Sequence, residues 1–544
     1  MKNEIKIGKE TVTVKGNVVD RVVNFFSPVR GQQRLKARTM QALAGSYIGA
    51  SRTRRALSQW SALSGDADSD TIADLPTLRN RSRDMIRNSP LATGAINTTC
   101  TNAVGTGLRL QVRPDRNVLG MDEAAADKWE ALVEREWSLF ADSQECDLAR
   151  TQNFYDQQDL VFRSALESGD TFVLMPYLER PGSPYGLKLQ IIEADRVCNK
   201  DLQRDSSTLV AGVEKDGYGA PTAYHIMDQH PGAYLSTIGK TWKVVPAFGK
   251  KTGRRNVIHL YQLLRPGQSR GVPFLAAVIE PLKQLDRYTE AELMAAVISG
   301  MFTVFIETPT GENSFGPMTP AAETGGKSGD DDLKLASGAI VSLSKGEKIE
   351  IANPGRPNTA FDPFVMAVLR QIGASLEIPF ELLIKHFTSS YSAARAALLE
   401  AWKFFSTQRR WLAENFCQIV YEAWLTEAVA KGRISAPGFF DDPVIRKAYL
   451  GAEWIGPAKG MIDERSEIEA AQMRADMGVT TLAEETAALT GGDWERKHRQ
   501  SVKERRMRLE GGLIQQTPVP NQQAQADAKI KEQARYENLL REGE

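Results

Sequence analysis

The feature that most constrains this chain is an apolar stripe at helical spacing that runs from Ser392 to about Ala430. Its large side chains recur at three- and four-residue steps, at Leu398, Trp402, Phe405, Leu412, Phe416, Ile419, Val420 and Trp424. Such a stripe predicts one helix about 60 Å long. Similar patterns predict a helix of about 40 Å from Pro273 to about Ser299 and a shorter one from Pro363 to about Glu377. In a chain of 544 residues, these helices predict a large protein of three or four packing units.

Composition supports folded domains and limits how the chain can meet nucleic acid. Hydrophobic residues make up 42% and charged residues 25%, which is enough for sizeable cores. Lys plus Arg equals Asp plus Glu at 68 each, whereas a protein that grips nucleic acid along its whole surface carries excess positive charge. Any DNA contact is therefore expected to be local.

Cysteine usage and targeting signals suggest a reducing, cytosolic setting. Cys100, Cys146, Cys198 and Cys417 form no CxxC pair, so neither a disulfide framework nor a zinc knuckle is expected. The longest apolar run, Leu293 to Ile306, is too short to cross a bilayer. The first residues mix charges through every apolar stretch, so no secretory signal is expected.

The middle of the chain predicts a domain of mixed helices and strands that reaches to about residue 270. Helical spacing covers 121–140 and 153–167, and a break at Asn88-Ser89-Pro90 separates two earlier helices. Trp129, Leu132, Val133 and Trp137 are expected in the core. Short β-rich runs punctuated by Pro and Gly predict strands at 171–177, 187–192, 209–213, 223–227 and 257–261. The predicted fold class is α+β.

Catalytic patterns are scarce. The five histidines, His225, His230, His259, His386 and His498, form neither HxxxH nor HExxH. The sequence Thr324-Gly-Gly-Lys-Ser328 lacks the first glycine and the leading strand of a phosphate loop. Asp330, Asp331 and Asp332 follow a glycine and are expected to be solvated rather than to hold a cation. We therefore expect no enzyme activity, no cofactor and no metal.

Five sequence blocks, in order, carry a family resemblance. They span Arg81–Asp115, with its basic helix, Pro break and VGTG turn, then Ile191–Val197, Ile258–Asp286, Tyr391–Trp402 and Ala452–Asp463. In these blocks, and over about residues 20 to 510, the chain resembles the portal proteins of lambda-type tailed phages. The resemblance implies the multi-domain portal fold and a ring, typically of twelve copies, at one vertex of the capsid.

The resemblance also implies function and partners. The ring would be the conduit for packaging and ejecting double-stranded DNA, without ATPase or nuclease chemistry of its own. Its partners would be other copies of the chain, phage DNA, the terminase large subunit, the major capsid and scaffold proteins, and head-to-tail adaptor proteins, with no membrane. The expected location is the portal vertex of the virion, and the host cytoplasm during assembly.

Two rival functions are weighed against the portal. Another ring-forming head-to-tail connector would usually be a much shorter chain without paired stem helices around an insert. A packaging ATPase would need a phosphate loop after a strand, together with clustered acids for a metal. Both fit the sequence less well.

Applied to this chain, the family architecture gives a domain map. The expected parts are a basic N-terminal arm (1–60), an α+β wing (61–272), stem helix 1 (273–300), a small α/β clip (301–358), stem helix 2 (359–378), a tunnel loop (379–391), a long wing helix with its return to the wing (392–459), an all-helical crown (460–510) and a polar, disordered tail (511–544).

Charge patterns give candidate site residues, each with an alternative. Residues 1–60 carry 12 Lys/Arg and 3 Asp/Glu. This excess predicts either an electrostatic arm for DNA or an acidic partner, or a solvated tail. Residues 280–362 carry 13 Asp/Glu and 7 Lys/Arg, either to repel DNA from a channel wall or only to remain soluble. The expected clip docking residues are Glu312, Lys327, Asp330, Asp331 and Asp332.

Two further sets are expected near DNA. The tunnel-loop set is Lys385, His386, Ser389, Ser390 and Tyr391, with Ser392 as the cap of the long helix. The alternative is that Phe387 and Tyr391 tuck into the wing. The crown set is Arg496, Lys497, Arg499, Lys503, Arg505, Arg506 and Arg508. The alternatives are a solvated surface or pairing with acids such as Glu484 and Glu485.

Overall fold

The computed structural model of the chain forms two compact units, residues 1–66 and 67–544. The residues it describes are 2–7, 10–15, 23, 25–29, 32–33, 55–57, 59–61, 64–233, 240–300, 304–307, 348–351, 359–387, 390–460 and 463–513. In the first unit, β1 (Lys2–Ile7) pairs antiparallel with β2 (Glu10–Lys15). This pairing agrees with the alternation of Ile5, Ile7, Val12 and Val14 in the sequence, which is typical of strands. The sequence also predicts a broken helix from Gln33 to Trp60, and most of that range lies outside the described residues.

The second unit opens with three helices, α3 (Ala67–Thr71), α4 (Leu75–Asn88) and α5 (Pro90–Ala103). The break predicted between α4 and α5 is present. Ser89 is extended and Pro90 starts the next helix, where its missing N–H costs nothing. After α5 the chain turns through Gly107 at φ +97, and a Cβ there would lie 2.5 Å from the Tyr155 side chain.

The largest core packs aromatic side chains between distant helices. α7 (Glu123–Ala141) and α8 (Phe154–Ser168) supply Trp137 and Phe154, whose ring centroids lie 5.1 Å apart. Trp424 from α13 (Gln418–Ala430) meets Trp137 at 5.0 Å, edge to face. Trp129, Val133 and Trp137 are buried as predicted, while Leu132 is half-buried.

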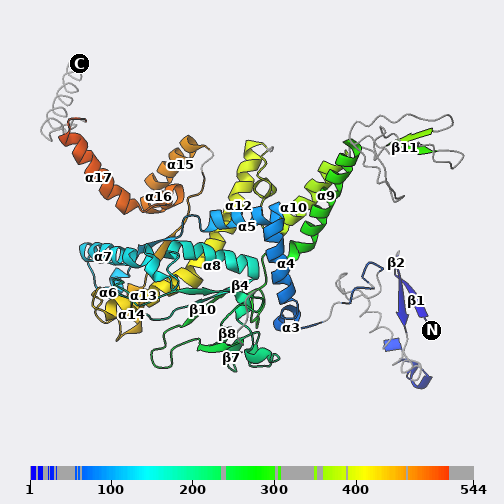
Figure 1. The fold of residues 1–544 in the computed structure, drawn as a ribbon, viewed down its shortest axis with the longest axis horizontal. Helices are drawn as coiled ribbons and strands as arrows, with labels where there is room; N and C mark the ends of the chain where they lie inside the picture. The colour runs from blue at the N-terminus through cyan, green and yellow to red at the C-terminus, as the bar shows by residue number, and fades with distance from the viewer. Residues whose placement is uncertain are drawn as a thin grey trace, which may run out of the picture. The chain divides into compact units, whose positions relative to one another are not determined.

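The sheets are small, antiparallel and separate, which confirms the α+β class. One has the order β10-β4-β5, from β10 (Val257–Tyr261), β4 (Asp170–Leu174) and β5 (Gln190–Ile192). Helix α8 lies against β4 and β10 (Figure 1). A second has the order β6-β7-β8-β9, from β6 (Leu209–Val210), β7 (Val213–Lys215), β8 (Pro221–Met227) and β9 (Trp242–Pro246).

A third, two-stranded sheet of this unit joins strands from distant parts of the chain. β3 (Arg109–Val112) pairs antiparallel with β13 (Ala452–Ile455), with Leu110 opposite Trp454. Short α6 (Arg116–Leu119) and α14 (Pro443–Tyr449) accompany this pair. The sequence did not predict β3, β13 or β9, because each is short and only half-buried or mixed in its burial.

Two helices on either side of a chain insertion pack against each other. α9 (Ile279–Gly300) follows a 3₁₀ turn at Ala276–Val278, and α10 (Phe361–Ser375) returns beside it. Tyr288 stacks on Phe361 at 5.5 Å and meets Phe364 edge-on at 5.2 Å. Beyond α9, β11 (Val304–Glu307) pairs antiparallel with β12 (Lys348–Ile351).

The long predicted helix is present, with one irregularity. α12 (Tyr391–Leu412) runs through a π-helical segment (Ala413–Cys417) into α13. Phe416 and Cys417 in this segment are fully buried, and Phe416 stacks on Phe154 at 5.5 Å. A π-turn carries one extra residue, which rotates the side chains that follow it.

Three further helices end the described chain, α15 (Glu464–Asp476), α16 (Leu482–Thr490) and α17 (Trp494–Glu510). Thr481 and Glu484 form a capping box at the start of α16, and Gly491 ends it in the left-handed conformation. The sequence Gly491-Gly492-Asp493 thus separates α16 from α17. Among the described residues, no helix is both long and apolar enough to span a membrane.

Candidate functional site

The segment between α10 and α12 has a buried base. Its chain reverses just after α10, where Glu377 has φ +54 and the Ile378 amide donates to the Gly373 carbonyl at 3.0 Å. A Cβ on Gly373 would lie 2.7 Å from the Ile378 carbonyl oxygen, so this close return requires glycine. Ile378 itself is 1% exposed. The segment therefore starts from a fixed point in the core.

One short helical turn continues this base. α11 (Phe380–Leu383) buries Leu383 and packs against α5 and α10. The Arg370 guanidinium lies 5.4 Å from the centre of the Phe380 ring, a cation–π distance. The His386 amide then donates to the Glu381 carbonyl at 3.1 Å.

The tip of the segment is exposed. Lys385 has φ +55, and the side chains of Lys385, His386 and Ser390 lie in solvent. Phe387 is 54% exposed, so it does not tuck into the subunit as the alternative interpretation required. Ser389 and the side chain of Tyr391 lie outside the described residues.

The cap of the long helix differs from the predicted one. The Ser390 hydroxyl accepts from the Ala393 amide at 3.4 Å, so Ser390 is the cap and Ser392 lies inside α12. Both serines precede the apolar stripe, and the sequence offered no way to choose between them.

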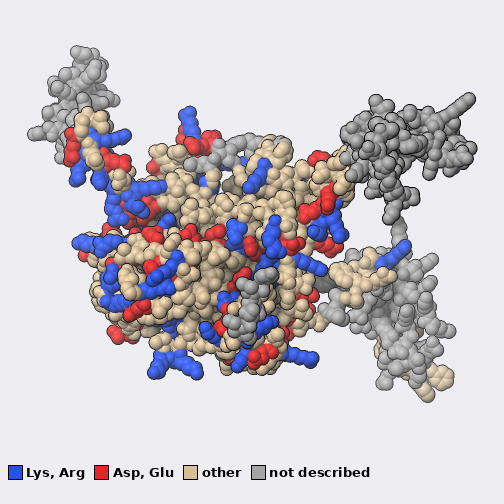
Figure 2. Space-filling model, viewed as in Figure 1, with Lys and Arg blue, Asp and Glu red and all other residues tan. Residues whose placement is uncertain are grey.

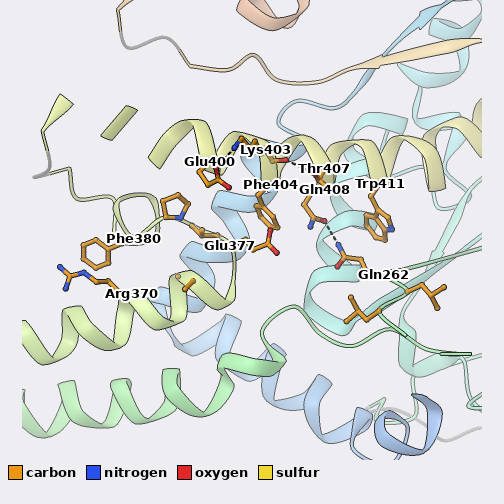
Figure 3. Close-up of a pocket in the computed structure, with 16 residues that line it drawn as sticks. Gln262, Arg370, Glu377, Phe380, Glu400, Lys403, Phe404, Thr407, Gln408 and Trp411 are labelled. Atoms are coloured by element: carbon orange, nitrogen blue, oxygen red, sulfur yellow. Dashed lines mark hydrogen bonds and ion pairs between the residues drawn. The ribbon is translucent and has the colours of Figure 1, made fainter. Parts of the chain in front are cut away.

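A groove of about 770 Å³ lies beside the base of this segment (Figure 3). Its walls are the end of α10, the outer face of α12 and the loop that follows β10. Gln262 of that loop donates to Gln408 of α12 at 2.7 Å, while Leu263 and Leu264 are 63% and 68% exposed. Sequence reasoning missed this groove, although two adjacent leucines ahead of Arg265-Pro266-Gly267 are a recognisable signal.

A buried charge cluster connects α4 and the segment just before α9 to strands β4 and β10. Asp170 is fully buried on β4 and binds Arg270 at 2.5 Å, Arg79 of α4 at 2.7 Å and His259 of β10 at 3.2 Å. Arg270 also donates to the carbonyls of Ala194, Val197 and Ala211. The guanidinium of Arg270, which lies just before α9, thus holds the turns that contain Ala194, Val197 and Ala211.

Electrostatics within this cluster favour the charged carboxylate. Burial alone would raise the pKa of Asp170, but Arg270 and Arg79 hold that pKa well below its usual range. Burial lowers the pKa of His259, although its bond to Asp170 opposes the shift. The cluster therefore holds an ionised Asp170 and a neutral His259 at neutral pH.

The predicted basic residues of the C-terminal region all lie exposed on α17. Arg506 pairs with Glu510 of the same helix, at 3.6 Å, and Lys497 donates to Thr490. The alternative of pairing with Glu484 and Glu485 does not form within the described part of the subunit. Glu485 binds Arg474 at 2.8 Å, and Glu484 is held in its capping box.

An ion-pair cluster attaches the start of α17. Arg113 reaches Glu495 of α17 at 3.2 Å and Glu130 of α7 at 3.6 Å. Asp127 lies beside these two carboxylates. Burial raises the pKa of Glu130 to about 7, against the pull of Arg113.

The expected docking residues Glu312, Lys327, Asp330, Asp331 and Asp332 lie outside the described residues. The structure describes only the two strands that flank this insertion. β11 and β12 pair from Val304 opposite Ile351 to Glu307 opposite Lys348, so the insertion leaves and rejoins the fold at one place.

Comparison with known proteins identifies the class. Residues 53–409 match the family model described as phage portal protein, lambda family. Portal protein B of Escherichia phage lambda is 25% identical over 498 residues, covering 87% of this chain and 92% of that protein. The portal protein of Escherichia phage N15 is 24% identical with the same coverage.

Among solved structures, one match is the neck of a native gene transfer agent particle, computed with C12 symmetry. Its TM-score is 0.40 at 14% identity, with 76% of this chain and 93% of that chain covered. The family match spans more than half of the sequence, so the chain belongs to the lambda family of phage portal proteins. This family is structural rather than enzymatic.

Proposed function

We propose that the chain assembles into a closed ring of twelve copies that conducts double-stranded DNA. The observation that carries this proposal is uncovered apolar surface on the longest elements. On α9, Leu293, Met294 and Val297 are 66%, 56% and 46% exposed. Apolar side chains along one helix usually mark a face that another protein surface covers. Neighbouring copies in a ring would supply that cover.

In this ring, α9 and α10 are the stem, and the segment 379–391 is the tunnel loop. Its buried base and exposed tip suit a loop that projects into a channel. Lys385 gives each copy one positive group at the tip, with His386, Ser389, Ser390 and Tyr391 around it. A single phosphate contact per copy is weak and salt-dependent, so DNA is guided without being arrested.

The charge of the stem and insertion supports the passage of DNA. Residues 280–362 carry 13 Asp/Glu and 7 Lys/Arg, a net of minus six per copy. A wall of that sign repels phosphate and lets the duplex slide, whereas a basic wall would bind it.

The insertion between α9 and α10 is the proposed docking platform. Its ends meet at the β11–β12 pair, so residues 308–347 leave and rejoin the described fold at one place. Glu312, Lys327, Asp330, Asp331 and Asp332 would meet the terminase large subunit during packaging and head-to-tail adaptors afterwards. Major capsid and scaffold proteins would surround the ring during assembly in the host cytoplasm.

The tunnel-loop assignment is tested by Lys385→Glu in assembling phage. We expect normal rings by native mass spectrometry, with packaged or retained DNA reduced severalfold because the one positive contact becomes repulsive. Lys250→Glu is a matched control, since Lys250 is also an exposed loop lysine and lies between β9 and β10. Wild-type phage yield from Lys385→Glu would leave the loop only a connector.

A further inference from the structure

The three C-terminal helices lack a core of their own. Among the described residues of α15, α16 and α17, only Ala471 is buried. Large apolar side chains instead face solvent on α15, α16 and the turn between them, at Ile468 (51%), Met473 (63%), Met477 (76%), Val479 (69%) and Leu482 (55%). Most helical stability in proteins comes from packing an apolar face, so these helices require a covering surface.

Helix α17 is attached mainly through its first turns. Glu495 binds Arg113, Lys497 reaches Thr490, and the Trp494 ring stacks on His498 at 4.9 Å. Every residue from Arg496 to Arg508 is exposed, including Val502 at 55% and Met507 at 57%. The described part of the subunit therefore leaves the rest of α17 uncovered.

Helix α17 is basic, whereas α15 and α16 are acidic, and within the described subunit the two charges do not form ion pairs with each other. Helix α17 carries seven Lys/Arg and three Glu, a net of plus four, and blue side chains project along it in Figure 2. Residues 464–490, which hold α15 and α16, carry six Asp/Glu and two Arg, a net of minus four. No described ion pair joins α17 to α15 or α16. Arg465–Glu469 and Arg474–Glu485 lie within α15–α16, Arg506–Glu510 lies within α17, and Glu495 pairs with Arg113.

We propose that α17 of one copy lies against α15 and α16 of the neighbouring copy in the ring. This contact rests on the ring of the proposed function and adds which surfaces meet. It is head-to-tail, because a basic helix of one copy meets an acidic pair of the next, and such a contact gives a ring when the rotation between copies closes. It would bury Val502 and Met507 together with Met473 of α15 and Met477 just after it.

The favoured occupant is a second copy rather than DNA. A duplex would neutralise the basic side chains of α17 but would leave its apolar side chains uncovered. It would also be repelled by the acidic α15 and α16. A copy of this chain offers both the negative charge and the apolar surface, whereas a duplex offers α17 only the charge.

Charge exchange tests the contact in assembled full-length protein. One variant carries Arg505→Glu, Arg506→Glu and Arg508→Glu, and another carries Glu467→Lys, Glu469→Lys and Asp476→Lys. We expect each set alone to lower the salt concentration at which rings dissociate at least twofold, and both sets together to restore most of the loss. Reversal of the exposed Lys250 and Lys251 to Glu is the control, and circular dichroism checks helix content.

Crosslinking between copies tests the same contact without altered charge. Subunits with Met507→Cys are mixed with subunits that carry Met473→Cys, Met477→Cys or Leu482→Cys, and the rings are oxidised. Native Cys100, Cys146 and Cys417 are buried and Cys198 is half-buried, so their background is low. We expect covalent dimers from at least one mixture, and none with the exposed wing position Val444→Cys.

Three results would overturn the contact, and they are distinguishable. Rings that form normally but give no dimers and no charge-reversal effect would refute it while leaving the proposed function intact. Unchanged ring stability in the α17 variant, with shortened packaged DNA that the α15 variant does not rescue, would assign α17 to DNA instead. Wild-type protein that forms no ring would overturn the proposed function, and the contact with it.

Discussion

At the scale of single residues, Asp170 and Arg270 hold the region before α9 together. These two residues are 100 positions apart, and Arg79 lies 91 positions from Asp170. No local spacing connects them, so the sequence could not predict the cluster. The sequence did show that His259 belongs to no catalytic pattern. The structure adds that it is a neutral, buried partner of Asp170.

Removing the carboxylate charge tests how much the cluster stabilises the fold. Asp170→Asn leaves Arg79 and Arg270 buried without a counter-charge, and we expect it to lower the free energy of unfolding by about 3–5 kcal/mol. Denaturant titration of the purified protein measures this change. Glu414→Ala removes an exposed pair with Arg410 and should change the same quantity by less than about 1 kcal/mol. Equal effects of the two substitutions would show that the buried charges are not held by Asp170.

Acid should lower the stability that the Asp170–His259 cluster contributes, in two stages. The pKa of His259 lies below its ordinary value of 6.5, so the unfolded chain takes up a proton first as pH falls through that value, and stability falls. The lowered pKa of Asp170 adds a further loss below its ordinary value of 3.8. Glu130, whose pKa is raised to about 7, acts with the opposite sign over the same range, so the test compares wild type with His259→Gln, which share Glu130. The unfolding midpoint of wild type relative to His259→Gln should fall from pH 7 to pH 5. A difference that stays constant or grows on acidification would contradict this sign.

At the scale of elements, the long helices were predictable and their details were not. Apolar spacing located α9, α10, α12 and α13, because each has a stripe long enough to exceed chance. The cap at Ser390 and the π-segment depend on geometry that spacing does not encode. The half-buried strands β3, β9 and β13 carry too weak an alternation to be recognised alone.

Two helical glycines give a matched pair of substitutions. Gly373→Ala places a Cβ 2.7 Å from the Ile378 carbonyl, so we expect a loss of about 1–3 kcal/mol in stability at the base of the tunnel loop. Gly94→Ala in α5 meets nothing within 4 Å and should stabilise the fold by about 0.5–1 kcal/mol. Thermal unfolding of both variants measures the difference. Equal shifts would show that the return at Gly373 is not tight.

At the scale of the whole molecule, the sequence predicted the family and the fold class. It did not predict the groove or the uncovered helix face on the surface. The blocks Arg81–Asp115 and Ile258–Asp286 carried the portal resemblance, because they combine helix breaks with a fixed order along the chain. The groove beside α12 and the uncovered face of α17 depend on which residues meet in space. No single segment of the sequence contains that information.

The insertion between α9 and α10 should be separable from folding. Replacing residues 308–332 with a short Gly/Ser linker keeps β11, β12 and their pairing, so we expect soluble rings. These rings should no longer bind the terminase large subunit in a pull-down assay. Unfolded protein, or unchanged binding, would contradict the proposed docking platform.

Native mass spectrometry of the purified full chain counts the copies in the assembly. We expect a closed ring of twelve copies of the 60.1 kDa chain that persists on dilution at moderate salt. A monomer at every concentration and salt condition would contradict it.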